Sequence, residues 1–424
     1  MLGLVLLLLA LFAASVPIAL ALGLAAVPTL LARNVPLIAI PQVVFESLDS
    51  FALMALPLYV LAGRLMQTGG IAARLVGVAK ALVSFVRGGL AAAVVLTSML
   101  FATISGSSAA TAAAVGSMLI PEMEKQRYPR PFSAATTASS GELGVIIPPS
   151  MAMILYGVIT NVSITDLFIA GILPGLLIGG SLILTVILIS WLRGYGEVQP
   201  FRPGPWASGL LAALRRGVLS LLMPVIILGG IFGGVFTATE AAAVAVVYAL
   251  FLGVVVYREI APRELPAIFA RAAVTSAVVM IIVAFAAMFA FALHLLRAPQ
   301  QIGALLSTVT TDPLVFLLLV NMFLIVVGMF METFAAIIIL APILAPIAAR
   351  VYGIDPVHFG LITIVNLAVG MVTPPVGVNL FIACGVARIT MEQLMRPLAV
   401  FLAVLFANLM IITYVPGLSL ALLR

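Results

Sequence analysis

The sequence predicts an all-α, polytopic membrane protein that forms a single integral membrane domain over residues 1–424. First, 64% of the residues are hydrophobic and 8% are charged, with a mean hydropathy of +1.33, whereas a soluble domain carries about 25% charged residues. Second, apolar runs long enough to cross a hydrocarbon core of about 30 Å recur along the whole chain. Third, two proline pairs interrupt such runs in similar surroundings, which indicates an inverted repeat with two re-entrant helical hairpins and two Pro-Pro broken helices.

The charges and the few reactive side chains narrow the possible functions. The net charge of +6 comes from 20 basic and 14 acidic residues, but the basic residues lie in short loops, where they indicate topology and not nucleic-acid binding. The single cysteine, Cys384, excludes an internal disulfide framework and a cysteine-based metal cluster. His294 and His358 lie far apart at expected span ends, and the buried segments hold no serine–histidine dyad or paired catalytic aspartates. We therefore expect no enzyme.

The apolar segments define the expected spans. The first, residues 1–31, has no basic n-region and is too long for a signal peptide, so we expect one retained spanning helix. Amphipathic segments at 33–48 and 68–87 are expected to lie along the membrane interface. A polar stretch, residues 193–216, divides the chain into two halves. Further spans are expected near residues 50–66, 132–160, 166–192, 217–234, 238–257, 272–296, 357–387 and 397–420.

Clusters of basic residues set the expected sidedness, because loops rich in Lys and Arg stay in the cytoplasm. The apolar stretch 88–121 has basic loops at both ends and a polar break at residues 105–108, which predicts a hairpin that enters from the cytoplasm. The stretch 314–349 breaks around Gly328 and residues 331–333 and has few basic neighbours, so it should enter from the periplasm. The N-terminus is then inside and the C-terminus outside. The cytoplasmic clusters are Arg64, Arg74, Lys80 and Arg87; Lys125, Arg127 and Arg130; the basic residues between Arg193 and Arg216; and Arg258, Arg263 and Arg271.

The two broken segments repeat one pattern. Residues 141–150 (GELGVIIPPS) and 367–376 (LAVGMVTPPV) align at one constant offset, and the same offset places Ser107 of the first hairpin tip on Thr333 of the second. Residues 88–160 and 312–387 are therefore expected to form two inverted transport-domain repeats, and the remaining spans the scaffold and arm helices. Inverted repeats of this kind are typical of secondary transporters.

The broken segments also predict a binding chemistry. Two successive prolines unwind a helix, and unpaired carbonyls in a membrane cost several kcal/mol each unless something satisfies them. Hydroxyls of Ser105, Ser107 and Thr333, together with the unwound carbonyls, are suited to two cages for a hard cation such as Na⁺. Helix N-termini nearby favour an anionic group. The alternative is that these motifs only kink helices and pack them closely; their duplication favours function.

Three acidic residues fall in or near the apolar segments. Intramembrane carboxylates are functional by default. Glu142 lies beside the first break and Glu332 at the second hairpin tip, and both a functional and a structural role stay open for them: they could carry protons, neutralise cations or brace the hairpins. Glu240 opens a helix at an expected periplasmic turn, where capping by Thr239 and the helix dipole predict a structural role.

Six segments resemble one known family along the whole chain. The family is the large membrane subunit, DctM-like or SiaM-like, of the tripartite ATP-independent periplasmic (TRAP) transporters. The pattern matches without a major departure, although a small Q-type subunit is not fused here and is expected as a separate chain. The segments are residues 51–76 (FALMALPLYVLAGRLMQTGGIAARLV), 105–122 (SGSSAATAAAVGSMLIPE), 141–156 (GELGVIIPPSMAMILY), 234–250 (GVFTATEAAAVAVVYAL), 328–346 (GMFMETFAAIIILAPILAP) and 370–381 (GMVTPPVGVNLF).

The resemblance implies an elevator-type transporter of the bacterial inner membrane. A transport domain would slide against a scaffold with two or more Na⁺ ions and an organic acid, such as a C4-dicarboxylate, sialic acid or another carboxylate, that a periplasmic substrate-binding protein delivers. Carried onto this sequence, the first Na⁺ site uses Ser105, Ser107, Gly144, Ile147 and Pro149, the second uses Glu332, Thr333, Met371, Thr373 and Pro375, and the substrate lies near Ser108, Thr111 and Asn379.

Two other classes remain as alternatives. The nearer is a stand-alone, ion-coupled carrier of organic anions with the same architecture and no binding protein. The other is an ion channel or a membrane-embedded enzyme, but a channel does not require two opposed hairpins. Neighbouring reading frames for a four-helix membrane protein and a secreted binding protein would separate the stand-alone carrier from the three-component system.

Overall fold

The computed structural model describes residues 2–36, 38–196 and 202–423, and all regular structure within these ranges is helical. Eight of the described helices are long and apolar enough to cross a membrane, or nine if one bent pair counts as a span. The predicted all-α, polytopic membrane class is therefore confirmed. Residue 1 of the first apolar segment, residue 37 of the first amphipathic segment and residues 197–201 of the polar stretch lie outside the described residues.

The first apolar segment is not one helix, so the predicted single span over residues 1–31 is wrong. Helix α1 (Leu2–Ala13) ends before Ser15, whose φ of 58° is left-handed, and α2 (Ile18–Ala32) begins after Pro17. Proline lacks the amide proton that a continuous helix needs at that point. Twelve residues of helix reach only about 18 Å, which is too short for the membrane core. The cytoplasmic position of the N-terminus stays a prediction.

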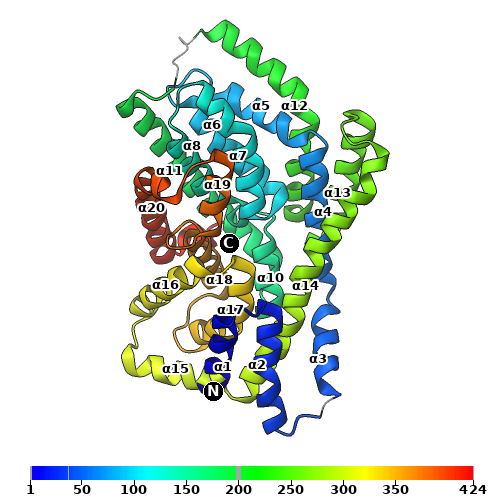
Figure 1. Cartoon of the computed structure of the whole chain (residues 1–424), viewed down its shortest axis with the longest axis vertical. Coiled ribbons are helices and arrows are strands. Elements are labelled where there is room, and N and C mark those ends of the chain that lie inside the picture. Colours follow the sequence, from blue (N-terminus) through cyan, green and yellow to red (C-terminus); the bar gives the residue numbers. More distant parts are fainter. Residues whose placement is uncertain (1, 37, 197–201, 424) are drawn as a thin grey trace.

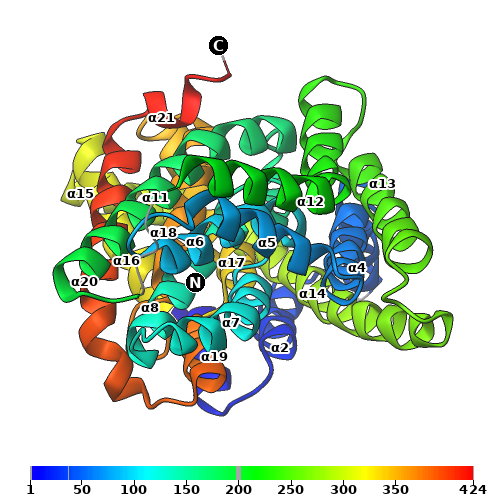
Figure 2. The same ribbon diagram turned by 90° about the horizontal axis from the view of Figure 1, so that it is seen from above.

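A first group of helices forms one side of the molecule, and we call it the α4 group. Figures 1 and 2 both show α4, α13 and α14 together at one side. Tyr59 donates a hydrogen bond to the Ala238 carbonyl at 3.2 Å, and Thr239 donates to the Phe51 carbonyl at 3.0 Å. The group comprises α2, α3 (Ala39–Leu48), the 3-10 turn Phe51–Met54, α4 (Ala55–Thr68), α13 (Ala238–Leu250), which continues as a π-helix over Phe251–Val256, and α14 (Leu265–Leu295), which follows a 3-10 turn at Pro262–Glu264.

Helices α5 (Ile71–Val83) and α12 (Pro203–Phe232) pack against each other and lie at the upper end of the molecule in Figure 1. Figure 2, the view from above, shows them running side by side across the molecule. Helix α5 falls within the amphipathic segment 68–87 and is a separate helix, as expected; its place at a membrane interface stays a prediction. Trp206 of α12 donates from Nε1 to the Ala81 carbonyl at 3.2 Å. The two helices thus join the α4 group to the rest of the chain.

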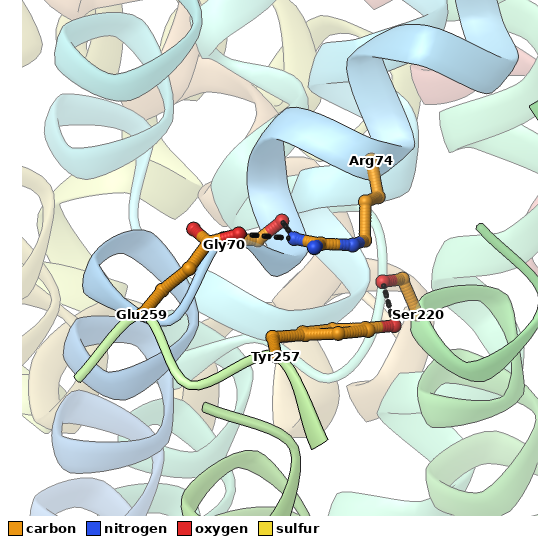
Figure 3. A network of polar contacts seen from close by, with 5 residues as sticks. All are labelled: Gly70, Arg74, Ser220, Tyr257 and Glu259. Carbon is orange, nitrogen blue, oxygen red and sulfur yellow. Dashed lines mark hydrogen bonds and ion pairs between the residues drawn. The ribbon is translucent and has the colours of Figure 1, made fainter. Parts of the chain in front are cut away.

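A polar network fixes the start of α5, as Figure 3 shows. Arg74 donates to the Gly70 carbonyl at 2.8 Å and to Glu259 at 2.7 Å. Its guanidinium lies 3.6 Å over the ring of Tyr257, whose hydroxyl is 3.1 Å from that of Ser220 on α12. Three segments that are distant in sequence therefore meet at one arginine.

The first hairpin consists of α6 (Gly89–Ser105) and α7 (Ser108–Lys125). The chain reverses at Gly106, whose φ of 59° is left-handed and favours glycine. Gly89 and Leu90 at the start of α6 line one cavity with Gln126 and Tyr128 after α7, so the two ends of the hairpin lie together.

The first broken helix follows directly. Helix α8 (Arg130–Gly141) and the short α9 (Leu143–Ile146) end before the proline pair, and α10 (Met151–Thr160) resumes after it with a bend of 41°. The peptide bond between Pro148 and Pro149 is cis. Helix α11 (Ile164–Arg193) then packs against α6, α18 and α20.

The second half repeats this order. After α15 (Ala298–Val309), the second hairpin consists of α16 (Pro313–Phe330) and α17 (Thr333–Arg350). Its ends are joined by the Tyr352 hydroxyl, which donates to the Thr310 carbonyl at 3.0 Å, and by stacking of Tyr352 on Phe316 at 4.0 Å. The second broken helix consists of α18 (Pro356–Met371) and α19 (Val378–Ala387), with a cis bond between Pro374 and Pro375, and α20 (Met391–Tyr414) and α21 (Gly417–Leu420) complete the chain.

The hairpins and broken helices form a second group with α11 and α20, which we call the hairpin group. Helix α11 packs on α6, α9 and α18, and α20 packs on α8 and α18, so both touch the predicted repeats. Figure 1 shows α6 and α7 toward one end of the molecule and α16 and α17 toward the other. The hairpins thus belong to opposite halves, with their tips between them.

The predicted basic clusters come together at one end. Lys80 forms an ion pair with Glu122, and Arg74 pairs with Glu259, so α5 meets both the end of α7 and the segment after α13. Arg193 lines one cavity with Pro129 and Arg396. The C-terminal end of α20 lies away from these clusters, beside the start of α16. There the Tyr414 hydroxyl donates to the Leu314 carbonyl at 3.3 Å.

Candidate functional site

Hydroxyls gather at the tip of the first hairpin. Ser107 caps the N-terminus of α7 by accepting a hydrogen bond from the Ala110 amide at 3.4 Å, as serine does at helix starts. The hydroxyls of Ser105 and Thr111 lie 2.8 Å apart, and that of Thr111 also donates to the Ser107 carbonyl at 2.8 Å. The tip is therefore a compact cluster of oxygen atoms.

The first break packs directly onto this tip. The Met151 amide donates to the Gly106 carbonyl at 3.3 Å. A Cβ on Gly144 would lie 2.5 Å from the Ser107 carbonyl oxygen and 2.5 Å from the Thr111 hydroxyl, so only glycine permits this approach. A Cβ on Gly106 would lie 3.2 Å from the Pro149 carbonyl oxygen.

Four of the five residues predicted for the first ion site are thus brought together: Ser105, Ser107, Gly144 and Pro149. The fifth, Ile147, is buried, and its amide donates to the Leu143 carbonyl at 2.9 Å. Its side chain packs against Gly175 on α11. The whole break, residues 141–150, is buried, so its carbonyls lie away from bulk water.

The second tip has a different cap. Glu332 precedes α17 and accepts a hydrogen bond from the Phe334 amide at 3.1 Å. Thr373 donates to the Val369 carbonyl one turn earlier in α18 at 2.7 Å. Pro375 is exposed, unlike its counterpart Pro149. Of the residues predicted for the second ion site, Thr333 and Met371 touch each other. The Glu332 and Thr373 side chains form hydrogen bonds with the backbone of the adjoining helices α17 and α18.

Equivalent positions of the two breaks both contact their own hairpins. Met151 and Gly377 occupy equivalent positions in the two repeats; the first donates its amide to Gly106 and the second donates its amide to the Met329 carbonyl at 3.1 Å. Gly370, the counterpart of Gly144, packs so closely on the second hairpin that a Cβ would lie 2.6 Å from the Gly328 Cα. The positions in the two breaks thus follow the constant offset, whereas their hairpin partners do not: Gly106 and Ser107 belong to the turn of the first hairpin, and Gly328 and Met329 belong to α16.

The two tips meet at one methionine. Ser108 of the first tip donates to the Met371 sulfur at 3.6 Å, and Thr333 of the second donates to it at 2.9 Å. All three residues are buried. Thioether sulfur is a weak acceptor on a flexible side chain. Both hairpins therefore converge on the start of the second break.

The residues predicted to bind substrate are buried and bonded to protein. Ser108 contacts Met371, Thr111 contacts the first tip, and Asn379 on α19 donates from Nδ2 to Glu142 Oε1 at 2.5 Å. Helices α7 and α19 pack together, so the three residues lie on neighbouring helices. The pairing of Glu142 with Asn379 has no signal in the sequence, because the residues belong to different repeats.

The remaining candidate residues have structural partners. Glu240 forms a capping box with Thr237: its carboxylate accepts a hydrogen bond from the Thr237 amide at 2.8 Å. The predicted structural role is confirmed, but the predicted capping residue, Thr239, is wrong, because helix α13 begins one residue after Thr237. The ring nitrogens of His358 lie 3.0 Å from the Ser419 hydroxyl and 3.2 Å from the Thr413 carbonyl. In the part of the chain that is described, no three His, Cys, Asp or Glu side chains gather as a metal site.

A cavity of about 250 Å³ lies beside the first tip and was not predicted. It lies between the α4 group and the hairpin group, and both groups line it. The sequence assigned its Arg64 only to a cytoplasmic basic cluster, although a charge inside the span 50–66 is itself a signal of a functional site. The lining residues are Val60, Gly63, Arg64, Gln67, Ser105, Ser107, Ala110, Ala113, Met151 and Thr275.

A solved structure shows the same overall fold. The YdaH transporter of Alcanivorax borkumensis superposes with a TM-score of 0.65 over 89% of this chain and 88% of its own, at 17% sequence identity. At this identity the likeness concerns the fold alone.

Sequence relatives supply the family. The isethionate TRAP transporter permease protein DctMQ of Oleidesulfovibrio alaskensis is 44% identical over 95% of this chain, which spans 63% of that longer protein. The C4-dicarboxylate large permease DctM of Pseudomonas aeruginosa is 43% identical over 89% of this chain and 87% of its own, and the sialic acid large permease SiaM of Vibrio cholerae is 39% identical over 90% and 88%. Residues 5–418 match the model of the tripartite ATP-independent periplasmic transporter DctM component. The chain therefore belongs to the DctM family of TRAP transporter large permeases, a family of transporters and not of enzymes.

Proposed function

We propose that the chain is the large permease subunit of a Na⁺-coupled, binding-protein-dependent TRAP transporter that imports an organic acid. The observation that carries the proposal is the convergence of Ser108 and Thr333, from opposite hairpins, on Met371. The tips of the two hairpins meet there beside the second break, as expected for a site between inverted repeats. The relatives are named for isethionate, C4-dicarboxylates and sialic acid, all of which are organic anions.

An elevator mechanism fits the division into two groups. The hairpin group would move as one body against the α4 group. Near the first tip the two groups touch closely, since a Cβ on Gly63 of α4 would lie 3.6 Å from the Ser105 Cα. At the second hairpin, α14 of the α4 group packs against α17. Helices α5 and α12 lie across both groups and would serve as arms.

The coupling ions fit the oxygen atoms of the two breaks. Na⁺ favours hydroxyl and carbonyl oxygens, as hard cations do. Ser105, Ser107 and the buried carbonyls around Gly144, Ile147 and Pro149 would hold the first ion. Thr333, Met371, Thr373 and Pro375, with Glu332, would hold the second mostly through backbone carbonyls. Bound ions would supply positive charge for the anionic substrate.

The partners follow from the family. A small Q-type membrane subunit would be a separate chain, unlike in the isethionate relative, whose name joins M and Q in one protein. A periplasmic binding protein would deliver the substrate. The end that gathers the basic clusters would face the cytoplasm of a bacterial inner membrane. The C-terminus after α20 would then be periplasmic, since Tyr414 contacts Leu314 at the opposite end.

Reconstitution tests this function. The large subunit with its small subunit should take up organic anions into proteoliposomes only with an inward Na⁺ gradient and the binding protein. Uptake that needs Na⁺ but no binding protein would favour the stand-alone carrier. Uptake that persists after the Na⁺ gradient is collapsed would contradict Na⁺ coupling.

A further inference from the structure

The cavity beside the first hairpin tip has one wall in each group. Val60, Gly63, Arg64 and Gln67 come from α4, whereas Ser105, Ser107 and Ala110 come from the first hairpin. Its volume of about 250 Å³ is slightly below the range of about 300–1,000 Å³ typical of pockets for small ligands. A compact organic anion, or the acid group of a larger one, fits this space.

Arg64 places an uncompensated positive charge in this cavity. Arg64 is half-buried, and among the described residues its side chain has one hydrogen-bond partner, the Thr275 hydroxyl on α14, which lies 3.3 Å from Nη2. A guanidinium carries five N–H donors, so several remain for another acceptor. An intramembrane charge without a partner is costly and is usually kept for a function.

Ion pairs neutralise three basic residues of the described chain, and Arg64 is not one of them. Over residues 2–36, 38–196 and 202–423, three ion pairs form, and none includes Arg64. All three pairs lie in the partly exposed segments around α5, α7 and the residues after α13. The three basic partners are Arg74, Lys80 and Arg130.

We propose that Arg64 binds the acid group of the transported anion, a carboxylate or sulfonate, in this cavity. Planar guanidinium groups bind such oxyanions through two parallel hydrogen bonds. The Ser107 hydroxyl and the Gln67 amide supply further donors on the cavity wall, while the Thr275 hydroxyl donates to the Arg271 carbonyl. The proposal rests on the function proposed above and adds a residue from the α4 group, outside both repeats.

The location also implies a coupling to Na⁺. Ser105 and Ser107 line the cavity and also belong to the oxygen cluster proposed for the first ion. An ion there would lie next to the bound acid group and raise its affinity through attraction between opposite charges. Because Arg64 belongs to the α4 group, movement of the hairpin group would carry the anion away from it. The contact with Arg64 would therefore exist in only one end state of transport.

The test compares Arg64→Gln and Arg64→Lys with Arg271→Gln, which removes one charge at an exposed position on α14. The probes are labelled succinate, isethionate and N-acetylneuraminate, with uptake measured in reconstituted vesicles with the small subunit and binding protein. Arg64→Gln should raise the KM for the transported anion by about tenfold or more, the range expected for a charge-assisted hydrogen bond, with a smaller change in maximal rate. Arg64→Lys should recover part of the affinity, and Arg271→Gln should match the parent protein.

Chemical rescue covers the case in which a variant folds poorly. The chain has one cysteine, Cys384, so Cys384→Ala with Arg64→Cys leaves a single thiol in the cavity. Modification by a cationic methanethiosulfonate reagent should restore anion affinity, whereas the neutral methyl reagent should not. A misfolded protein would respond to neither, and Arg64→Lys then decides alone.

Three outcomes would overturn the proposal. An unchanged KM in Arg64→Gln at normal membrane abundance would leave Arg64 without a role in binding. If the neutral reagent restores anion affinity as well as the cationic one, the volume of the side chain at position 64 matters and its charge does not. A defect that follows the fraction of anionic lipid in the vesicles, and not the anion transported, would assign Arg64 to a lipid headgroup. If the parent protein transports none of the three anions, the proposed function fails independently of Arg64.

Discussion

Asn379 donates a hydrogen bond of 2.5 Å to Glu142, although 237 positions separate the two residues in sequence. Both side chains are completely buried. Among the atoms of the described residues, Glu142 Oε2 and Asn379 Oδ1 have no hydrogen-bond partner. The pair joins the end of α8 in the first repeat to α19 in the second, so it links the two halves of the hairpin group.

Glu142→Ala should destabilise the protein, because the buried Asn379 side chain would lose its hydrogen bond to Glu142. An unsatisfied buried polar group costs about 1–3 kcal/mol. Glu142→Gln should be at least as stable as the parent, since its amide nitrogen replaces one unpartnered oxygen and offers a donor to Asn379 Oδ1. Thermal unfolding in detergent measures the difference. If the alanine variant unfolds at the parent temperature, the pair does not brace the repeats.

Gly144→Ala should impair Na⁺-dependent uptake, because the added Cβ would press on the Ser107 carbonyl and the Thr111 hydroxyl at 2.5 Å. The tip would have to move away from the break, and the Na⁺ concentration for half-maximal uptake should rise several-fold. Gly180→Ala on α11 is the matched control, since nothing lies within 4 Å of a Cβ there. If Gly144→Ala shows normal Na⁺ dependence, the close packing of Gly144 on the first tip is not needed for ion binding.

Ser105→Ala and Thr373→Ala should each lower the apparent Na⁺ affinity while expression holds. Ser105 supplies a hydroxyl to the oxygen cluster of the first tip, and Thr373 lies in the second break. Sodium titrations of uptake measure the effect, for which we expect about a tenfold rise in half-saturation, roughly the worth of one lost oxygen ligand. Ser117→Ala, on an exposed part of α7, should change nothing. Unchanged Na⁺ dependence in both variants would count against the proposed ion sites.

Arg74→Met should lower the free energy of unfolding by about 1 kcal/mol, the combined worth of a partly exposed ion pair and a cation–π contact. The residue joins α5 to Glu259 and Tyr257 (Figure 3). High salt should reduce the difference, because it screens the ion pair. Arg263→Met, at an exposed position, serves as control. If Arg74→Met and Arg263→Met have the same free energy of unfolding, the contacts of Arg74 do not stabilise the protein.

Local chemistry explains which elements the sequence could predict. Gly106 ends α6 because a left-handed residue favours glycine, and the Pro148–Pro149 pair interrupts a helix because proline lacks an amide donor. The same rule applied to Pro17 would have divided the first apolar segment, where length and hydropathy alone predicted one helix. The cap of α13 was misplaced by two residues, since Thr237 and Thr239 are both suitable caps and only the backbone distinguishes them.

The sequence by itself determined the membrane class and the family, because composition and aligned motifs are properties of the chain alone; the inverted repeat with its re-entrant hairpins stays a prediction. Only the tertiary structure decided that Glu142 meets Asn379, that both tips converge on Met371, and that Arg64 faces a cavity at the first tip. These relationships depend on how distant helices pack. In a membrane nearly every helix face is apolar, so the pattern of hydrophobic residues does not specify which faces meet.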